Sequence, residues 1–155
     1  MNNNNGLTNQ AVYDLFNRQL AVWQQASDNF NALANVGVKE ITVGGFQVKV
    51  QFNPARIVSS AAKVDPKTIK ERKCFLCAAN RPAIQEGIPF VGKKTEYAVL
   101  INPFPIFPKH LTVPDVNHVN QTIEGEYERY EDMLSLAETL DDFLFFYNGP
   151  KSGAS

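Results

Sequence analysis

The first half of the chain changes its hydrophobic period once, from helical to strand-like. Between residues 8 and 34, apolar side chains recur every three or four positions, which predicts one amphipathic helix. From Ile41 to Phe52 they occupy alternate positions instead, on either side of Gly44 and Gly45. Two alternating runs joined by two glycines predict a β-hairpin.

The second half contains shorter segments. Residues 55–73 are interpreted as a connector, and the stretch with Pro82, Gly87 and Pro89 as a polar loop. Alternation predicts strands over 95–101 and 110–113, and a helical period returns over about 121–142. Two further segments follow: an apolar run of strand length, Phe143–Tyr147, and a turn-rich loop, Asn148–Ser155.

This order of elements predicts an α+β fold, in which helices flank an antiparallel sheet. The 155 residues suit one domain, with residues 1–6 as a disordered tip and residues 7–155 as the domain. The sequence ends in a small-residue loop just after a strand of buried character. We therefore expect the sheet to be incomplete at its C-terminus, and the edge at Phe143–Tyr147 to invite a homo-oligomer or strand exchange.

Composition narrows the classes of partner. Fifteen basic residues face sixteen acidic ones, so the net charge is −1 and no overall field attracts nucleic acid or an anionic membrane. No apolar run approaches the roughly 20 residues of a membrane span, and the Asn-rich start does not resemble a signal peptide. Nucleic acid and membrane are therefore not expected partners, and the cytoplasm is the expected compartment.

Cys74 and Cys77 form a Cys-x-x-Cys pair, which in a chain without a secretion signal points to metal or redox chemistry. Two thiolates at this spacing can hold one tetrahedral ion, but zinc takes four ligands. The two histidines, His110 and His118, are the other candidates. A redox pair would open a helix, whereas Asn80-Arg-Pro follows here and would end such a helix early. The pair alone leaves metal, redox and inert thiols open.

Three further positions have both an ordinary and a functional interpretation. His110 begins a strand, where it is either satisfied by hydrogen bonds or functional. Asn102 ends a strand before Pro103, where its amide either closes a turn or meets sugar hydroxyls. The loop 148–155 is either a plain loop or one whose backbone N–H groups approach phosphate.

Three motifs, taken in order, resemble the histidine triad superfamily. Cys74-Phe-Leu-Cys77-Ala-Ala-Asn80-Arg81 is similar to the zinc knuckle of galactose-1-phosphate uridylyltransferases. The segment from Asn102 to His118 resembles the strand–loop–strand region of the superfamily, and the loop 148–155 resembles its phosphate loop. The branch most similar contains these transferases, the GDP-sugar phosphorylases and the diadenosine tetraphosphate phosphorylases.

The resemblance implies a fold, a cofactor and a set of site residues. It implies a histidine-triad-like sheet and zinc ligated by Cys74, Cys77 and His118. It implies that Asn102 binds the ribose hydroxyls of a nucleotide and that His110 has a structural or supporting role. The residues it places at phosphates are Asn148, Gly153 and Ser155, with Arg81 near the base or a phosphate.

The implied function is the N-terminal part of a nucleotidyltransferase or nucleoside-diphosphate-sugar phosphorylase that acts through a nucleotidyl-histidine. In the family a His-x-His-x-Gln motif follows the phosphate loop and carries the nucleophile, so we expect that histidine beyond Ser155 and no catalytic residue within this chain. The chain alone is then expected to be inactive. The alternatives are a non-catalytic zinc-stabilised module that binds a nucleotide or a protein, and a thiol–disulfide protein; zinc content separates the last from the others.

Overall fold

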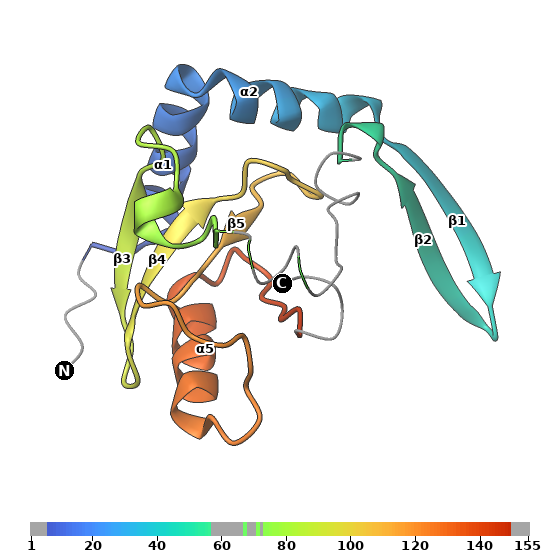
Figure 1. The fold of residues 1–155 in the computed structure, drawn as a ribbon. Helices are drawn as coiled ribbons and strands as arrows, with labels where there is room; N and C mark the ends of the chain where they lie inside the picture. Colours follow the sequence, from blue (N-terminus) through green and yellow to red (C-terminus); the bar gives the residue numbers. More distant parts are fainter. Residues whose placement is uncertain (1–5, 57–66, 68–70, 72, 150–155) are drawn as a thin grey trace.

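The computed structural model describes residues 6–56, 67, 71 and 73–149, which form a mixed α/β protein with small antiparallel sheets (Figure 1). Its helices are α1 (Asn9–Val22), α2 (Gln24–Asn31) and α5 (Tyr127–Thr139). Its strands are β1 (Gly37–Val43), β2 (Phe46–Phe52), β3 (Gly87–Val91), β4 (Glu96–Ile101) and β5 (Leu111–Thr112). Short 3-10 turns cover Ala32–Asn35, Pro54–Arg56 and Ala78–Asn80.

The predicted N-terminal helix is two helices that meet at Trp23. The Thr8 hydroxyl caps α1 by accepting a hydrogen bond from the Ala11 N–H at 3.1 Å. Trp23 then leaves the helical region, with φ −104° and ψ 88°, and its side chain is buried. The break turns α2 so that Phe30 meets Phe16 edge to face, with ring centroids 5.5 Å apart. The helical period of the sequence therefore predicts the two helices but not the bend between them. The bend occurs at Trp23, whose side chain is buried in the core.

The predicted hairpin is confirmed. β1 and β2 pair antiparallel with Val43 opposite Phe46, so Gly44 and Gly45 form a two-residue turn. Both glycines have positive φ, 57° and 85°, as the favoured two-residue hairpin turn requires. The hairpin projects from the rest of the molecule as an arm (Figure 1).

The second sheet has the order β3-β4-β5, with β4 antiparallel to both neighbours. The predicted strands at β4 and β5 are confirmed within two residues, whereas the interpretation of 87–91 as loop is wrong. Gly87 and Pro89 are typical loop residues, so the sequence pattern did not indicate a strand at this place. Pro89 is tolerated because β3 lies at the end of this sheet's strand order, and Gly87 is needed because a Cβ there would lie 2.6 Å from a Leu100 methyl.

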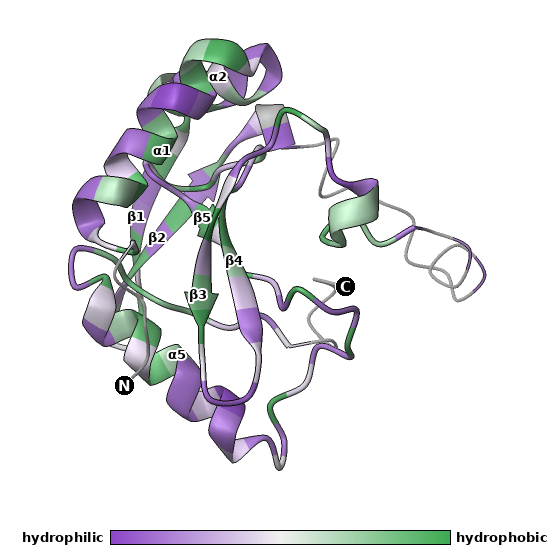
Figure 2. Ribbon diagram, turned by 90° about the vertical axis from the view of Figure 1, so that its left-hand side faces the viewer, coloured by the Kyte–Doolittle hydropathy of each residue, from purple (hydrophilic) through white to green (hydrophobic). Residues whose placement is uncertain are grey.

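The core lies between one face of this sheet and the helices. Tyr97, Val99 and Ile101 alternate along β4 and are all buried. Helices α1 and α5 lie on the same side of the sheet, with their apolar residues turned inward (Figure 2). The helical residues of this core include Val12, Leu15, Phe16, Leu136 and Leu140. Among the helices in the described ranges, none has the length and apolarity that crossing a membrane requires.

The end of the described chain differs most from expectation. The helix expected over 121–142 begins only at Tyr127, two residues after Gly125, whose φ is 77°. The strand expected at Phe143–Tyr147 is wrong: residues 144–149 are neither helix nor strand. Phe143 and Phe145 pack against the core while Leu144 is 88% exposed, so the segment alternates like a strand without pairing with the sheet. The apolar edge strand expected there is therefore not formed.

Candidate metal centre

The Cys-x-x-Cys pair sits in a tight turn between residue 73 and β3. The Cys77 N–H donates to the Cys74 carbonyl at 3.3 Å, and the Asn80 N–H donates to the Cys77 carbonyl at 2.9 Å. The Asn80 side chain closes the turn by donating to the Cys74 carbonyl at 2.9 Å. This knuckle fixes both cysteine backbones, and neither cysteine is in a disulfide.

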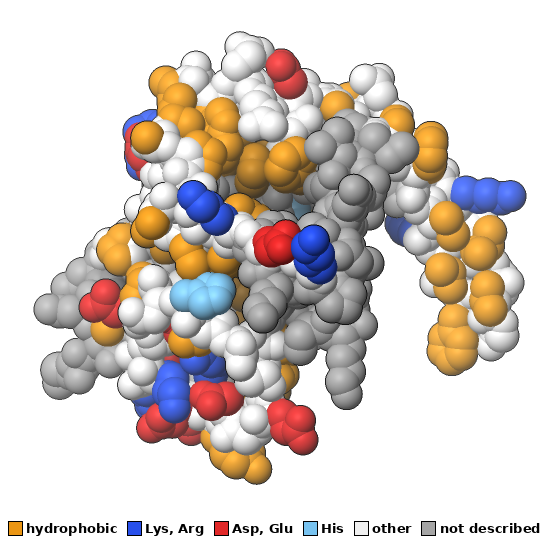
Figure 3. Space-filling model, viewed as in Figure 1, with side chains coloured by type: hydrophobic (Ala, Val, Ile, Leu, Met, Phe, Trp, Pro, Cys, Tyr) orange, Lys and Arg blue, Asp and Glu red, His pale blue; other side chains and the backbone are white. Residues whose placement is uncertain are grey.

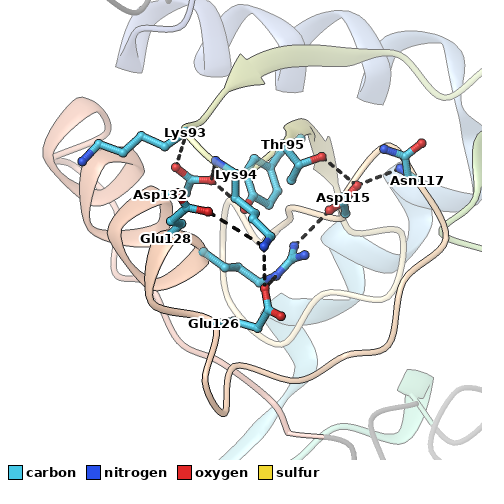
Figure 4. A network of polar contacts seen from close by, with 10 residues as sticks. Lys93, Lys94, Thr95, Asp115, Asn117, Glu126, Glu128 and Asp132 are labelled. Atoms are coloured by element: carbon cyan, nitrogen blue, oxygen red, sulfur yellow. Dashed lines mark hydrogen bonds and ion pairs between the residues drawn. The ribbon is translucent and has the colours of Figure 1, made fainter.

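His118 reaches the same place from the loop between β5 and α5. The start of that loop is bound to β4, because the Ala98 N–H donates to the Pro114 carbonyl and Tyr97 forms a β-bridge with Asp115. The Asp115 carboxylate accepts from the Thr95 hydroxyl at 3.2 Å and from the Asn117 N–H at 2.8 Å (Figure 4). His118 follows this turn directly, so Asp115 positions the loop that carries it.

The ligand atoms of Cys74, Cys77 and His118 all lie within 4.8 Å of one another, and the Cys77 Sγ is 3.2 Å from the His118 Nδ1. Sulfur and nitrogen ligands of one tetrahedral zinc ion lie about 3.5 Å apart, given bonds of about 2.3 and 2.0 Å. Two sulfurs and one imidazole nitrogen are donors that such an ion takes. The three residues therefore form a group that could hold a metal ion.

Electrostatics at the knuckle favours the protonated thiol when no ion is bound. Partial desolvation, then the hydrogen bond and charge of Cys74, raise the pKa of Cys77, and the positive charge of Arg81 opposes them. Metal ions bind the thiolate and the neutral imidazole, so they compete with protons. Binding at this group therefore weakens as the pH falls.

The residues expected at the nucleotide lie in different segments. Arg81 lies beside the knuckle, where its charge acts on Cys77. Asn102 directly follows β4, and its amide oxygen accepts from the Phe104 N–H at 2.9 Å in a turn. The Asn148 carbonyl accepts from the Gln121 side chain, three residues beyond His118. Gly153 and Ser155 lie outside the described residues.

His110 is partly buried beside the aromatic rings of Phe107 and Phe146. Its ring stacks on Phe146 with centroids 5.9 Å apart, and its Nδ1 accepts from the Ile106 N–H at 3.3 Å. Burial, and secondarily the charge of Arg56, lower the pKa of His110 from 6.5 to about 4. The ring is therefore neutral at pH 7, and its Nδ1 is occupied.

Two acidic residues that the sequence did not single out organise this half of the molecule (Figure 4). Asp132 of α5 is 2% exposed and accepts from the N–H groups of Lys93 and Lys94, at 2.5 and 3.1 Å, and from the Tyr97 hydroxyl at 2.9 Å. Asp115 pairs with Arg129 of α5 at 3.0 Å. The turn at Asp115 could have been found in the sequence, because Asp residues often accept from the backbone N–H two positions later. The partners of Asp132 lie 35 or more residues away, so no local spacing indicates them.

The fold and the Cys/Cys/His group define a mixed α/β protein with a candidate metal centre. Residues 15–155 match the family described as a domain of unknown function, DUF4922, and the chain therefore belongs to that family. No curated protein and no solved structure matches the chain.

Proposed function

We propose that this chain is the zinc-stabilised, nucleotide-binding N-terminal part of a cytoplasmic nucleotidyltransferase or nucleoside-diphosphate-sugar phosphorylase with a histidine-triad-like fold. The observation that carries the proposal is the meeting of Cys74, Cys77 and His118 within 4.8 Å, although His118 lies 41 residues beyond Cys77. The ordered motifs that resemble the superfamily supply the rest.

The ion would act as a cross-link in this proposal. When bound, it would tie the knuckle after residue 73 to the loop that carries His118. Asn80 supports it on one side through the Cys74 carbonyl, and Asp115 on the other through its turn. These contacts orient the ligands before an ion arrives, as partners behind metal ligands generally do.

The nucleotide would lie toward Asn102 and Asn148. Since a turn N–H already occupies the Asn102 amide oxygen, the NH₂ end of that side chain is the group that would meet a ribose hydroxyl. Phosphates would face Asn148, Gly153 and Ser155, with Arg81 as a nearby cation. These roles rest on the resemblance and on the positions of the described residues.

Group transfer would need a nucleophilic histidine that attacks the α-phosphorus, forming an N–P bond as the P–O bond to the leaving group breaks. Neither histidine of this chain suits that role. His118 belongs to the metal group, and His110 is stacked with its Nδ1 occupied. We therefore propose that the chain alone does not turn over nucleoside-diphosphate sugars.

Metal analysis of the purified chain tests the zinc. One zinc per chain is expected, and Cys74→Ser, Cys77→Ser and His118→Ala should each lower the content, with affinity falling as the pH is lowered. His110→Asn is the matched control, since it changes the other histidine and should leave the metal content unchanged. A wild-type chain purified with zinc present that still holds none would overturn the zinc assignment.

Calorimetric titration with GDP and ADP tests the nucleotide. Asn102→Ala should weaken binding by roughly 1–3 kcal/mol, the usual cost of leaving a polar partner unpaired. Asn120→Ala, an exposed asparagine in the loop before α5, should have no effect. Binding that is equal in both variants would remove Asn102 from the site.

A non-catalytic zinc module is the second candidate. Its support is that the Asn102 amide oxygen and the His110 Nδ1 already have partners within the protein. Phosphate-dependent release of nucleoside diphosphate from GDP- or ADP-sugars separates the two, measured for this chain and for one extended through a His-x-His-x-Gln segment. Activity only in the extended chain supports the transferase, and activity in neither supports the module.

A further inference from the structure

The arm formed by β1 and β2 has two unlike faces. The register sets Val43 opposite Phe46, Ile41 opposite Val48, Lys39 opposite Val50 and Gly37 opposite Phe52. Directly opposed residues share a face, so this face is apolar apart from Lys39. We call these residues the arm face: Gly37, Lys39, Ile41, Val43, Phe46, Val48, Val50 and Phe52. The opposite face carries Glu40 and Lys49, an ion pair at 3.3 Å, with Thr42, Gln47, Gln51 and a single apolar residue, Val38.

The arm face has little cover within the described residues. Phe46 is 76% exposed and Phe52 71%, and Ile41 is the one residue of the two strands that is partly buried. Figure 3 shows these apolar side chains gathered along the projecting arm. Contiguous apolar surface of this kind marks an interaction site, and a two-stranded hairpin is only marginally stable in water by itself.

The root of the arm is held against the body. The Gln51 side chain donates to the Ile106 carbonyl at 3.1 Å, and the Asn53 side chain donates to the Pro105 carbonyl at 3.4 Å. Pro105 is among the fully buried side chains, so these bonds lead into a fixed part of the molecule. The arm is thus presented at a defined position, which a binding surface requires.

Area and charge favour a second copy of the same face as the occupant. With exposed fractions of this size the arm face presents on the order of 500 Å² of side-chain surface, so two copies would bury about 1,000 Å², the lower limit for a specific interface. The arm face carries a single positive charge, Lys39, which is too little to attract nucleic acid or an anionic membrane. A twofold pairing needs only that the patch complement itself. With the arms antiparallel, Phe46 at the tip would lie over the root of the partner's arm face, where Gly37 has no side chain.

We propose that two copies of this chain associate through their arm faces, forming a four-stranded sandwich around a twofold axis. The interface is small and apolar, so the dimer is weak, with dissociation in the micromolar range. It is independent of the metal group, and it differs from pairing at Phe143–Tyr147.

Sedimentation velocity from 1 to 200 μM tests the dimer, with thermal unfolding and metal content as checks on the fold. The wild-type chain should show a reversible monomer–dimer equilibrium. Val50→Asp, in the arm face, should raise the dissociation constant at least tenfold, because twofold symmetry buries the new charge twice. Val38→Asp is the matched control: it makes the same change on the same hairpin, at a residue of similar exposure on the opposite face.

Each outcome decides the proposal. A dimer that Val50→Asp weakens and Val38→Asp leaves unchanged supports it. A chain that stays monomeric at every concentration overturns the proposal. A dimer weakened equally by both substitutions, or by neither, also overturns the arm face as the interface. A wild-type chain that holds no zinc but still dimerises through the arm face would contradict the proposed function and not this inference.

Discussion

Single polar side chains hold distant segments of this protein together. Asp132 binds the turn between β3 and β4 from α5, and Asp115 fixes the loop that precedes His118. The His110 ring stacks on Phe146 of the final segment, and its Nδ1 accepts from the Ile106 N–H in the loop before β5. Each has low exposure or several partners, so substitutions at these positions act on specific contacts.

His110 should make stability depend on pH. Its pKa is about 4 in the folded protein and about 6.5 when unfolded, so below pH 6.5 the unfolded chain takes up the proton first. The free energy of unfolding should therefore fall by about 1 kcal/mol between pH 7 and pH 5, with allowance for partial exposure. Urea unfolding at both pH values measures this. His110→Asn keeps an acceptor for the Ile106 N–H and should remove the part of the pH dependence that comes from His110. If this variant loses as much stability between pH 7 and pH 5 as the wild-type chain, His110 is not its source.

Gly92→Ala should be one of the most damaging small substitutions. A Cβ there would lie 2.3 Å from the Asp132 carboxylate, which is buried and already holds three donors. A loss of about 2–3 kcal/mol is expected from denaturant unfolding. Gly37→Ala is the control, because its Cβ would be 4.0 Å from the nearest atom. Adding Asp132→Ala to Gly92→Ala should cost less than the sum of the two changes, and strict additivity would exclude the clash.

At the scale of elements, what could be predicted followed from local patterns. The hairpin was predictable because its period and its two glycines are both local. The break at Trp23, the strand β3 and the absence of a strand at Phe143–Tyr147 depend on contacts with other segments, which no local period records. The same holds for the candidate site. The sequence motifs indicated Cys74, Cys77 and His118, whereas the role of Asp115 became visible only in the folded structure.

Asp115 should control metal affinity without being a ligand. Asp115→Ala removes the acceptor of the Asn117 N–H and the Arg129 pair, so the His118 loop loses its anchor. Metal affinity should fall by 10- to 100-fold, the usual effect of a residue that positions a ligand. Competition with a chelating dye measures it. Glu131→Ala removes an equal charge from an exposed ion pair, and equal affinities in the two variants would exclude a positioning role.

At the scale of the whole molecule, contacts close the chain onto itself around one core. Asn9 and Tyr13 of α1 donate to Asp141 and Asp142 just after α5, each at 2.6 Å. The knuckle and the His118 loop lie on separate segments that the proposed ion would join. Folding and metal binding should therefore be linked.

Removing the metal should lower the stability of the whole domain. An ion present at about 1,000 times its dissociation constant adds about 4 kcal/mol, so chelation should lower the Tm by roughly 10 °C in a domain of this size. Calorimetry with and without a chelator measures the shift. Cys77→Ser without chelator should give the same low Tm, and a chelator effect that persists in Cys77→Ser would place the ion elsewhere.

Trp23 gives the protein an optical reporter of its own. It is the single tryptophan in the sequence, and it is 6% exposed at the junction of α1 and α2. Its fluorescence should be blue-shifted in the folded chain and move to the red when the core opens to water. Since Trp23 belongs to the core cluster and not to the knuckle or the arm, a change in its emission reports loss of the core itself. Metal exchange or association of the arms with the core intact should leave its emission wavelength unchanged, so one spectrum separates these events from unfolding.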